Sequence, residues 1–360
     1  GSMLLYALLH LSGYDLPMEE LMRFRQLNSM TPGHPESQLT PGVEMATGPL
    51  GQGLAHAVGQ AMAERFLAAR FNRPGHTILD HHTYVIVSDG DLMEGISSEA
   101  ASLAGHHRLG KLILLYDSNQ ISIDGSIRRT FTEDVRARFD AFGWQTLLVE
   151  AGNDIEAISA AIDAAKADQN RPSLIEIRTV IGFGSPAKAG TAKSHGSPLG
   201  LDEVTAAKKA LGLPDTAFYA PPEAYAFFAL AAEKGKEERT AFEERMDRYR
   251  AAFPTEAAEL ERVWAAEWDE SWLGNVEGLD TAAATRKHGE TVLQAIAAKN
   301  PTVLGGSADL FESTFTHVKD SGPFEPENPT GRNIYFGVRE HAMAAAVNGM
   351  TMHGGVKPIA

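Results

Sequence analysis

The sequence predicts an α/β protein with a mostly parallel sheet flanked by helices. Two short runs of branched apolar residues, Tyr84–Val87 and Leu112–Tyr116, are typical of strands buried on both faces of a parallel sheet. Between them, Leu92–Arg108 has the apolar spacing of a helix. Because the crossover in such a unit leaves its two strands parallel, both should end at the same edge of the sheet.

Polar residues follow both runs at the point where each strand should end. Ser88-Asp89-Gly90 follows the first and Asp117-Ser118-Asn119 follows the second. Open α/β sheets bind ligands beyond the carboxyl ends of their strands, so Asp89 and Asn119 should share a crevice. Carboxylate and amide oxygens suit a small hard cation such as Mg²⁺. Asp and Asn also form turns and cap helices, and the pattern alone leaves that alternative open.

Periodicity predicts the remaining elements. Strands are expected at the end of Phe139–Val149 and over Ser173–Val180, Val303-Leu304 and Ile334–Phe336. Helices are expected over Met3–Leu11, Leu16–Leu27, a segment containing Leu54 and Phe66, Ile155–Gln169, Leu201–Leu211, Tyr225–Phe253, Glu256–Trp268, Ala284–Ala298 and His341–Met352. The later strands and helices indicate that a second α/β unit begins near Asp280.

Two long Pro- and Gly-rich loops carry candidate functional residues. Met30–Met45 contains His34, and residues 182–200 contain His195. A third segment, Thr47–Gly53, places three glycines before a helix, where backbone N–H groups can approach an anion. Glycines there can also serve only to ease a turn, and either histidine can be an ordinary surface residue.

Composition limits the classes of function. The chain has 360 residues, of which 43% are hydrophobic, which suffices for one large domain and part of another. A net charge of −15 disfavours nucleic acid and membrane surfaces as partners. The absence of cysteine excludes disulfides, zinc–thiolate sites and thiol catalysis. We expect a soluble, intracellular protein, and both ends resemble cuts inside a longer chain.

Seven motifs together resemble the transketolase family of thiamine-diphosphate enzymes, in the family's order and across essentially the whole chain. They are TPGHPE (31–36), TGPLGQGLAHAVG (47–59), SDGDLMEGISSEA (88–100), YDSNQISIDG (116–125), IGFGSPAKAGT with SHG (181–196), GGSADL (305–310) and GVREHAM (337–343). The resemblance implies a diphosphate-binding domain over residues 1–255, a helical linker over 256–284 and the start of a pyrimidine-binding domain over 285–360.

The resemblance also implies a cofactor and metal site. Asp89 and Asn119 match the side-chain ligands of Mg²⁺, for which Ca²⁺ is a substitute, and Ile121 matches a carbonyl ligand. Gly90 matches a contact to the diphosphate, and Gly48 and Leu50 match residues that line thiamine diphosphate. The family pattern has glycine at Ser88 and an acidic or amide residue at Ser118, but both ligand positions are retained.

Further residues match the family's catalytic and substrate-binding positions. His34 and His195 resemble residues that hydrogen-bond the donor sugar or the diphosphate. Glu340 resembles the glutamate that hydrogen-bonds the aminopyrimidine of cofactor held by the partner subunit, and Glu94 matches a residue at the dimer contact. Arg286 and Ser313 resemble binders of the sugar phosphate. Taken alone, Arg286 could be an exposed helix charge and Ser313 a helix cap.

The implied activity is transfer of a two-carbon ketol unit from a ketose phosphate of the xylulose 5-phosphate type to an aldose phosphate. The acceptor would be of the ribose 5-phosphate or erythrose 4-phosphate type, in the non-oxidative pentose phosphate pathway of the cytoplasm. The resemblance implies a homodimer with its site at the subunit interface, and neither nucleic-acid nor membrane partners.

Several alternatives stay open at this point. They are dihydroxyacetone synthase, deoxyxylulose-phosphate synthase, an inactive dimerising fragment and an NAD dehydrogenase. The motifs TPGHPE and TGPLGQG favour transketolase over the second, and the last lacks a GxGxxG motif after a first strand.

Overall fold

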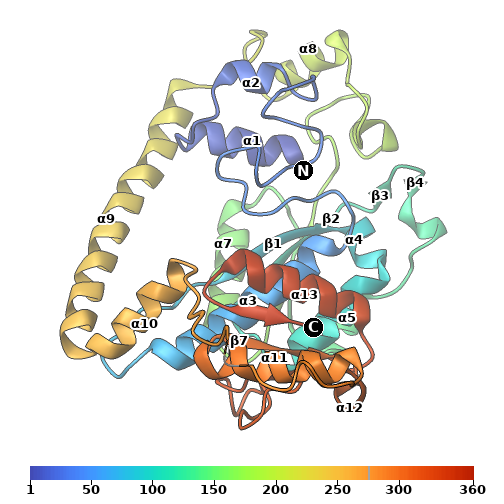
Figure 1. Ribbon diagram of the computed structural model, residues 1–360. Coiled ribbons are helices and arrows are strands. Elements are labelled where there is room, and N and C mark those ends of the chain that lie inside the picture. Colours follow the sequence, from blue (N-terminus) through green and yellow to red (C-terminus); the bar gives the residue numbers. More distant parts are fainter. Residues whose placement is uncertain (275) are drawn as a thin grey trace. The chain divides into compact units, whose positions relative to one another are not determined.

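Four parallel strands form the main sheet in the order β1-β2-β6-β5. Figure 1 labels the first two of them, β1 and β2. The computed structural model describes residues 1–274 and 276–360. The strands are β1 (Thr83–Ser88), β2 (Leu112–Ser118), β5 (Gln145–Val149) and β6 (Ser173–Arg178). In the parallel pairing of β1 with β2, Val87 lies opposite Tyr116 and Ser88 lies opposite Asp117. The predicted parallel unit is therefore confirmed, and its two strands end level with one another.

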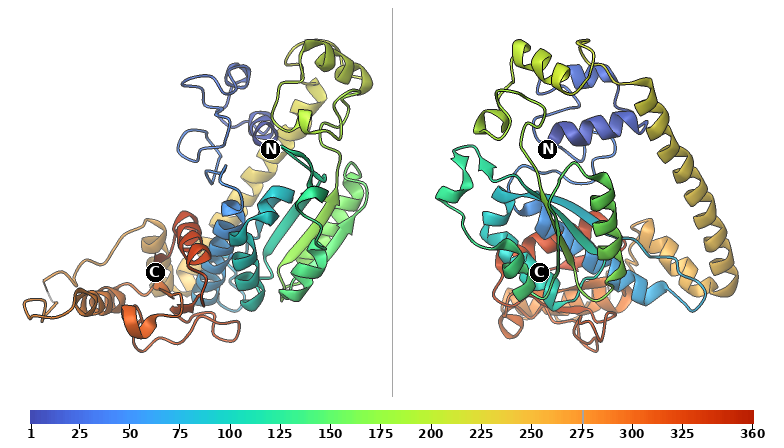
Figure 2. Two further views of the ribbon diagram at one scale, coloured as in Figure 1. Left: turned by 90° about the vertical axis from the view of Figure 1, so that its right-hand side faces the viewer. Right: turned by 180° about the vertical axis from the view of Figure 1, so that it is seen from behind.

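Helices cover both faces of this sheet (Figure 2). Helix α7 (Ile155–Ala167) packs through Ala165 onto Ile113 and Ile175 on one face. The helices of the opposite face are α3 (Gln52–Phe71), α4 (Asp89–Met93) and α5 (Gly95–His106). The single helix predicted over Leu92–Arg108 is wrong in one respect, because Glu94 has an extended backbone and divides it into α4 and α5.

A second parallel sheet follows in the order β8-β7-β9. Its strands are β7 (Val303–Ser307), β8 (Asn333–Tyr335) and β9 (Lys357–Ile359). Its helices are α11 (Thr285–Lys299), α12 (Phe311–Thr314) and α13 (Glu340–His353). This arrangement confirms the start of a second α/β unit, although the sequence pattern did not predict β9.

The chain divides into two compact units. The second unit holds both parallel sheets and comprises Gly51–Ser118, Glu133–Arg178 and Arg245–Ala360, with α6 (Val135–Ala141) and α10 (Pro254–Trp264). The first comprises Gly1–Leu50, Asn119–Thr132 and Thr179–Glu244. It contains α1 (Ser2–Leu11), α2 (Met18–Met22), the hairpin β3 (Ile121–Ser122) and β4 (Gly125–Ser126), the 3₁₀ turns η1 (Ile127–Arg129) and η2 (Ala192–Ser194), and α8 (Leu201–Ala210).

Helix α9 (Pro222–Ala252) begins in the first unit and ends in the second. The domain boundaries expected at residues 255 and 284 stay a prediction. Within residues 1–274 and 276–360, every helix is too short or too polar to cross a membrane.

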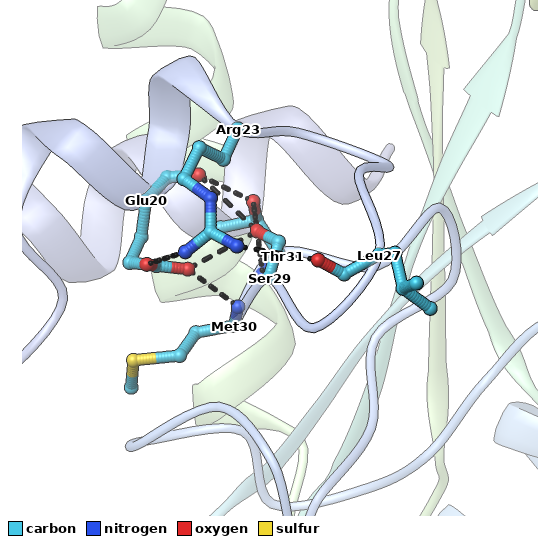
Figure 3. A network of polar contacts seen from close by, with 6 residues as sticks. All are labelled: Glu20, Arg23, Leu27, Ser29, Met30 and Thr31. Atoms are coloured by element: carbon cyan, nitrogen blue, oxygen red, sulfur yellow. Dashed lines mark hydrogen bonds and ion pairs between the residues drawn. The ribbon is translucent and has the colours of Figure 1, made fainter.

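The helix expected over Leu16–Leu27 is much shorter than predicted. Helix α2 spans only Met18–Met22, and Arg25 and Asn28 adopt left-handed conformations that no helix tolerates. The Glu20 carboxylate instead accepts hydrogen bonds from the Met30 amide at 2.6 Å and the Ser29 hydroxyl at 3.1 Å (Figure 3). The Met30 amide is the main reason that the pKa of Glu20 is lowered.

Two glycines allow helices α3 and α13 to touch backbone to backbone. A Cβ atom at Gly59 in α3 would lie 2.0 Å from the Ala346 carbonyl oxygen in α13. Reciprocally, a Cβ atom at Gly349 in α13 would lie 1.9 Å from the His56 carbonyl oxygen in α3. Because neither backbone can yield without moving a whole helix, this contact fixes the separation of the two helices.

Strand β1 is the first strand in its sheet and has one partly uncovered face. Tyr84 and Ile86, which point to that face, are 49% and 65% exposed. Val87 points to the other face and is buried. The strand that precedes Asp89 is therefore packed on one side only.

Burial also affects the ionisation of His107, which follows α5 and is 2% exposed. Its ring lies 5.1 Å from the Phe324 ring, and neither ring nitrogen has a hydrogen-bond partner among residues 1–274 and 276–360. Burial, together with the nearby charges of His106 and Arg65, lowers the pKa of His107 to about 3. The folded protein therefore holds this imidazole neutral.

We predict that Gly59→Ala destabilises the protein by about 3 kcal/mol or more, because the new methyl group overlaps the Ala346 carbonyl. Gly235→Ala in α9 is the matched control, since a Cβ atom there meets nothing within 4 Å. Better helix propensity should stabilise that variant by about 0.5–1 kcal/mol. Urea unfolding measures both, and equal effects would contradict the close contact.

We predict that His107 makes the fold sensitive to acid. Its folded pKa of about 3 lies below the unfolded value of 6.5. The contribution of the buried neutral His107 to the free energy of unfolding is therefore fully present above pH 6.5. It is lost as the pH falls toward 3, by about 1.4 kcal/mol per pH unit for one histidine. His107→Leu should flatten urea-unfolding stability between pH 7 and 5, whereas His317→Leu, at an exposed position, should not. An unchanged slope in His107→Leu would refute the assignment.

Candidate functional site

Asp89 stands at the start of α4, immediately after β1, and is 1% exposed. The Tyr116 hydroxyl on β2 donates a hydrogen bond to Asp89 Oδ1 at 2.5 Å. Burial raises the pKa of Tyr116 well above its usual value, and the hydrogen bond to the Asp89 carboxylate raises it further. Tyr116 therefore stays protonated and directs its donor at one carboxylate oxygen of the predicted metal ligand.

Asp91 connects the end of β1 with the start of α3. Its Oδ2 accepts from the Ser88 amide at 2.8 Å and the Ser88 hydroxyl at 3.0 Å, which forms a capping box. Its Oδ1 accepts from the Gly51 amide at 3.1 Å. The sequence interpretation did not single out Asp91 or Tyr116. The S-x-x-D spacing of Ser88 and Asp91 is a signal that could have identified the first of them.

Gly51 occupies a position that only glycine can fill. Its φ is +77°, and a Cβ atom there would lie 2.8 Å from Ile96 Cγ2 and from Ser97 Oγ. Gly51 is thus required by close packing as well as by the turn. Gly90, predicted to contact diphosphate, is the second residue of α4.

Asn119 and Ile121 belong to one tight turn in the first unit. The Ile121 amide donates to Asn119 Oδ1 at 3.0 Å, and Gln120 between them has a φ of +64°. Asn119 therefore has the turn-forming role of the alternative interpretation, and the turn brings two of the three predicted metal ligands together. Asp89 belongs to the second unit, so a site shared by all three residues stays a prediction.

His34 and Gly48 come together in the first unit. A Cβ atom at Gly48 would lie 3.0 Å from His34 Cγ and Cδ2, so the exposed imidazole rests against this glycine. The Thr47 amide donates to the Pro35 carbonyl at 3.1 Å and ties the two loops together. Leu50 is 49% exposed and free to contact a ligand.

His195 follows the turn η2 and is exposed. Its loop is anchored on both sides of the histidine. Lys188 Nζ donates to the Leu199 carbonyl at 2.6 Å, and the Ala187 amide donates to Glu203 Oε1 at 2.8 Å. Hydrogen bonds from Ser185 and Ala187 lower the pKa of Glu203. The ordered loop presents His195 to solvent.

Glu340 is the first residue of α13 and is exposed. The residues around it are held by the second unit. The Ala342 amide donates to Glu99 Oε2 at 3.0 Å, and Arg339 Nη2 donates to Ser102 Oγ at 3.0 Å. Glu340 therefore extends from a fixed helix end, as a residue that acts on a ligand requires.

Arg286 and Ser313 are both exposed and belong to α11 and α12 of the second unit. The Arg286 guanidinium lies over the Phe315 ring at 5.7 Å from its centroid. Ser313 is exposed and lies inside α12, whose N-cap is Leu310, so Ser313 does not cap that helix. Their binding of a sugar phosphate stays a prediction. Glu94, predicted at the dimer contact, is exposed at the start of α5.

The donor set fits a magnesium–diphosphate complex better than a metal held by protein alone. Among residues 1–274 and 276–360, no three His, Cys, Asp or Glu side chains form a group that could hold a metal. The predicted ligands are one carboxylate, one amide oxygen and one carbonyl. Mg²⁺ commonly combines one or two protein carboxylates with phosphate and water oxygens.

Comparisons with known proteins agree with these motifs. The family model described as "Transketolase, thiamine diphosphate binding domain" matches residues 1–268. The model described as "Transketolase, pyrimidine binding domain" matches residues 281–360. The transketolase of Geobacillus stearothermophilus is 52% identical over 361 residues, which are 99% of this chain and 54% of that protein. The chain thus spans about half the length of the curated relatives it matches.

Solved structures show the same fold. A transketolase from Leishmania mexicana matches with a TM-score of 0.96 and 45% identity, covering 99% of this chain and 53% of that chain. A transketolase from Pichia stipitis, in complex with sedoheptulose-7-phosphate, matches with a TM-score of 0.95 and 44% identity. That match covers 99% of this chain and 54% of that chain.

We predict that Tyr116→Phe destabilises the protein by about 1–3 kcal/mol, because it removes a donor from a buried carboxylate. Tyr225→Phe is the matched control, since that hydroxyl contacts His10 at an exposed position. The control should change stability by about 0.5 kcal/mol or less. Urea unfolding at pH 7 compares the two variants, and a Tyr116→Phe effect no larger than the control would oppose the assignment.

Proposed function

The chain belongs to the transketolase family, and on that premise we propose that its protein transfers a two-carbon ketol unit from a ketose phosphate to an aldose phosphate. The observation that carries the proposal is the buried Asp89 carboxylate at the end of β1, inside the motif SDGDLMEG. A donor of the xylulose 5-phosphate type and acceptors of the ribose 5-phosphate or erythrose 4-phosphate type complete the proposal. The sedoheptulose-7-phosphate complex of the Pichia stipitis relative supports this substrate class.

The proposed cofactors are thiamine diphosphate and Mg²⁺, with Ca²⁺ as a substitute ion. Bound thiamine diphosphate would supply the electron sink for cleavage of the ketose carbon–carbon bond. Asp89, Asn119 and the Ile121 carbonyl would hold the cation. Gly90 would offer its backbone to the diphosphate, and Gly48 and Leu50 would line the cofactor. The 49% exposure of Leu50 supports its place in this lining.

Glu340 is the proposed acid at the aminopyrimidine ring. It would hold a proton at its carboxyl group and donate it in a hydrogen bond to ring nitrogen N1′. Its place on a helix end fixed by Glu99 and Ser102 supports this role, because a proton donor must be held in position. The cofactor concerned would lie in the partner subunit of a cytoplasmic homodimer.

Four exposed side chains would orient the sugar phosphate. His34 and His195 would hydrogen-bond the donor sugar or the diphosphate, and both come from loops anchored within the first unit. Arg286 and Ser313 would bind the sugar phosphate, since a guanidinium presents paired donors to phosphate oxygens. The exposure of both side chains supports this role.

A ketol-transfer assay tests this proposal against the alternatives. The protein is supplied with Mg²⁺, thiamine diphosphate, xylulose 5-phosphate and ribose 5-phosphate, and its intact mass is measured in parallel. Formation of the seven-carbon ketose phosphate is expected. Preference for formaldehyde as acceptor would indicate a dihydroxyacetone synthase. Turnover by a chain of 360 residues would exclude the inactive-fragment alternative.

We predict that Asp89→Ala reduces Mg²⁺-dependent binding of thiamine diphosphate by at least about 100-fold, because the cation loses its charged protein ligand. Asp163→Ala on the exposed side of α7 is the control and should bind normally. Calorimetric titration measures affinity, and circular dichroism checks that both variants fold. Unchanged affinity in a folded Asp89→Ala variant would contradict the metal assignment.

A further inference from the structure

We propose that Asp91 is a positioning residue for the cofactor site. It acts by joining the turn that carries Asp89 to the glycine loop that begins α3. The inference deepens the proposed function and rests on it for the identity of the ligand. The connection that Asp91 makes between Ser88 and Gly51, called the joint below, is a property of the folded chain and can be tested without any cofactor.

The Asp91 carboxylate connects two segments that are 40 residues apart in the chain. Oδ1 accepts from the Gly51 amide, and Oδ2 accepts from the amide and the hydroxyl of Ser88. Ser88 directly precedes Asp89, and Gly51 directly follows Leu50. One side chain therefore joins the turn that carries the predicted metal ligand to the residue at the amino end of α3.

The backbone of Asp91 is held by a third segment of the chain, helix α5. The Ser97 hydroxyl of α5 donates a hydrogen bond to the Asp91 backbone carbonyl. Its side chain and its backbone are thus attached to different elements. Since a side chain anchored at both ends has little freedom to rotate, it transmits position between the elements it joins.

Helix α3 depends on a cap from outside its own sequence. Its N-cap is Gly51, which has no side chain and tolerates none, because Ile96 and Ser97 occupy the space. The Asp91 carboxylate provides the acceptor for the Gly51 amide and places a negative charge at the positive end of the helix. It therefore orients the same helix end that the glycine loop precedes.

An aspartate is required here because all three partners can donate. They are the amides of Gly51 and Ser88 and the hydroxyl of Ser88. An asparagine would have to turn its NH₂ group toward at least one of these donors. Since both carboxylate oxygens are already engaged, Asp91 is not expected to touch the ligand and is not a catalytic residue.

The experiment compares Asp91→Asn, Asp91→Ala and Ser88→Ala in the whole protein. Ser88→Ala removes only the hydroxyl bond. Thiamine diphosphate affinity in the presence of Mg²⁺ should fall by about 10- to 100-fold in both Asp91 variants, as for other residues that orient metal ligands. Ser88→Ala should show a smaller loss. The KM for cofactor should rise more than kcat falls at saturating cofactor.

Asp154→Ala is the matched control, because Asp154 caps α7 through the Ala157 amide at 3.0 Å and lies away from this joint. It should lose a comparable helix cap yet keep cofactor affinity within about twofold. Similar destabilisation with unchanged cofactor affinity in Asp91→Asn would mean that Asp91 is only a helix cap, and would overturn the proposal.

Amide hydrogen exchange without cofactor provides the second measurement. Asp91→Asn should accelerate exchange at both Gly51 and Ser88, whereas Asp154→Ala should leave both unchanged. Unaltered exchange at Gly51 and Ser88 would refute the joint. If the unmodified protein binds no thiamine diphosphate, the proposed function fails, and the exchange result still decides whether Asp91 joins the two segments.

Discussion

The second unit depends on the contact between the backbones of α3 and α13. Gly59 and Gly349 lie against opposite carbonyls, so the two helices approach more closely than any side chain would permit. Near their amino ends, Gln52 Nε2 lies 2.7 Å from His341 Nε2 and ties the helices a second time. Gly51 at the start of α3 and Glu340 at the start of α13 are therefore carried by a single rigid pair of helices, and rigid support is what a ligand site needs.

The sequence predicted those elements that are marked by a short local run of apolar residues. Val87 in β1 and Leu112 and Leu114 in β2 are buried, and their apolar runs identified both strands. Prediction failed where distant contacts decide the backbone. The pattern after Leu16 is helical, but the Glu20 carboxylate binds the Met30 amide and folds the chain back after Met22. Strand β9 was missed because Lys357–Ile359 forms a strand only by pairing with β7.

The residues of the candidate site also fall into two groups, those that local sequence could predict and those that depend on distant contacts. Asp89 was found because it follows a recognisable strand, whereas the roles of Gly48 and His34 came from the family's motifs, since their loops alone left other interpretations open. Their contact could not be read from the sequence, since it depends on how two loops pack. Tyr116 lies within an apolar run, and the sequence did not indicate that its hydroxyl donates a hydrogen bond to the Asp89 carboxylate. Asp91 had a local signature, but its bond to Gly51 spans 40 residues.

The partly uncovered face of β1 affects how this chain behaves at high concentration. A terminal strand carries a row of backbone donors and acceptors, and here Tyr84 and Ile86 add apolar surface beside it. Such a strand is a template on which another polypeptide can add in β conformation. Because β1 ends at Ser88, directly before Asp89, a polypeptide added along this edge would lie beside the predicted metal ligand.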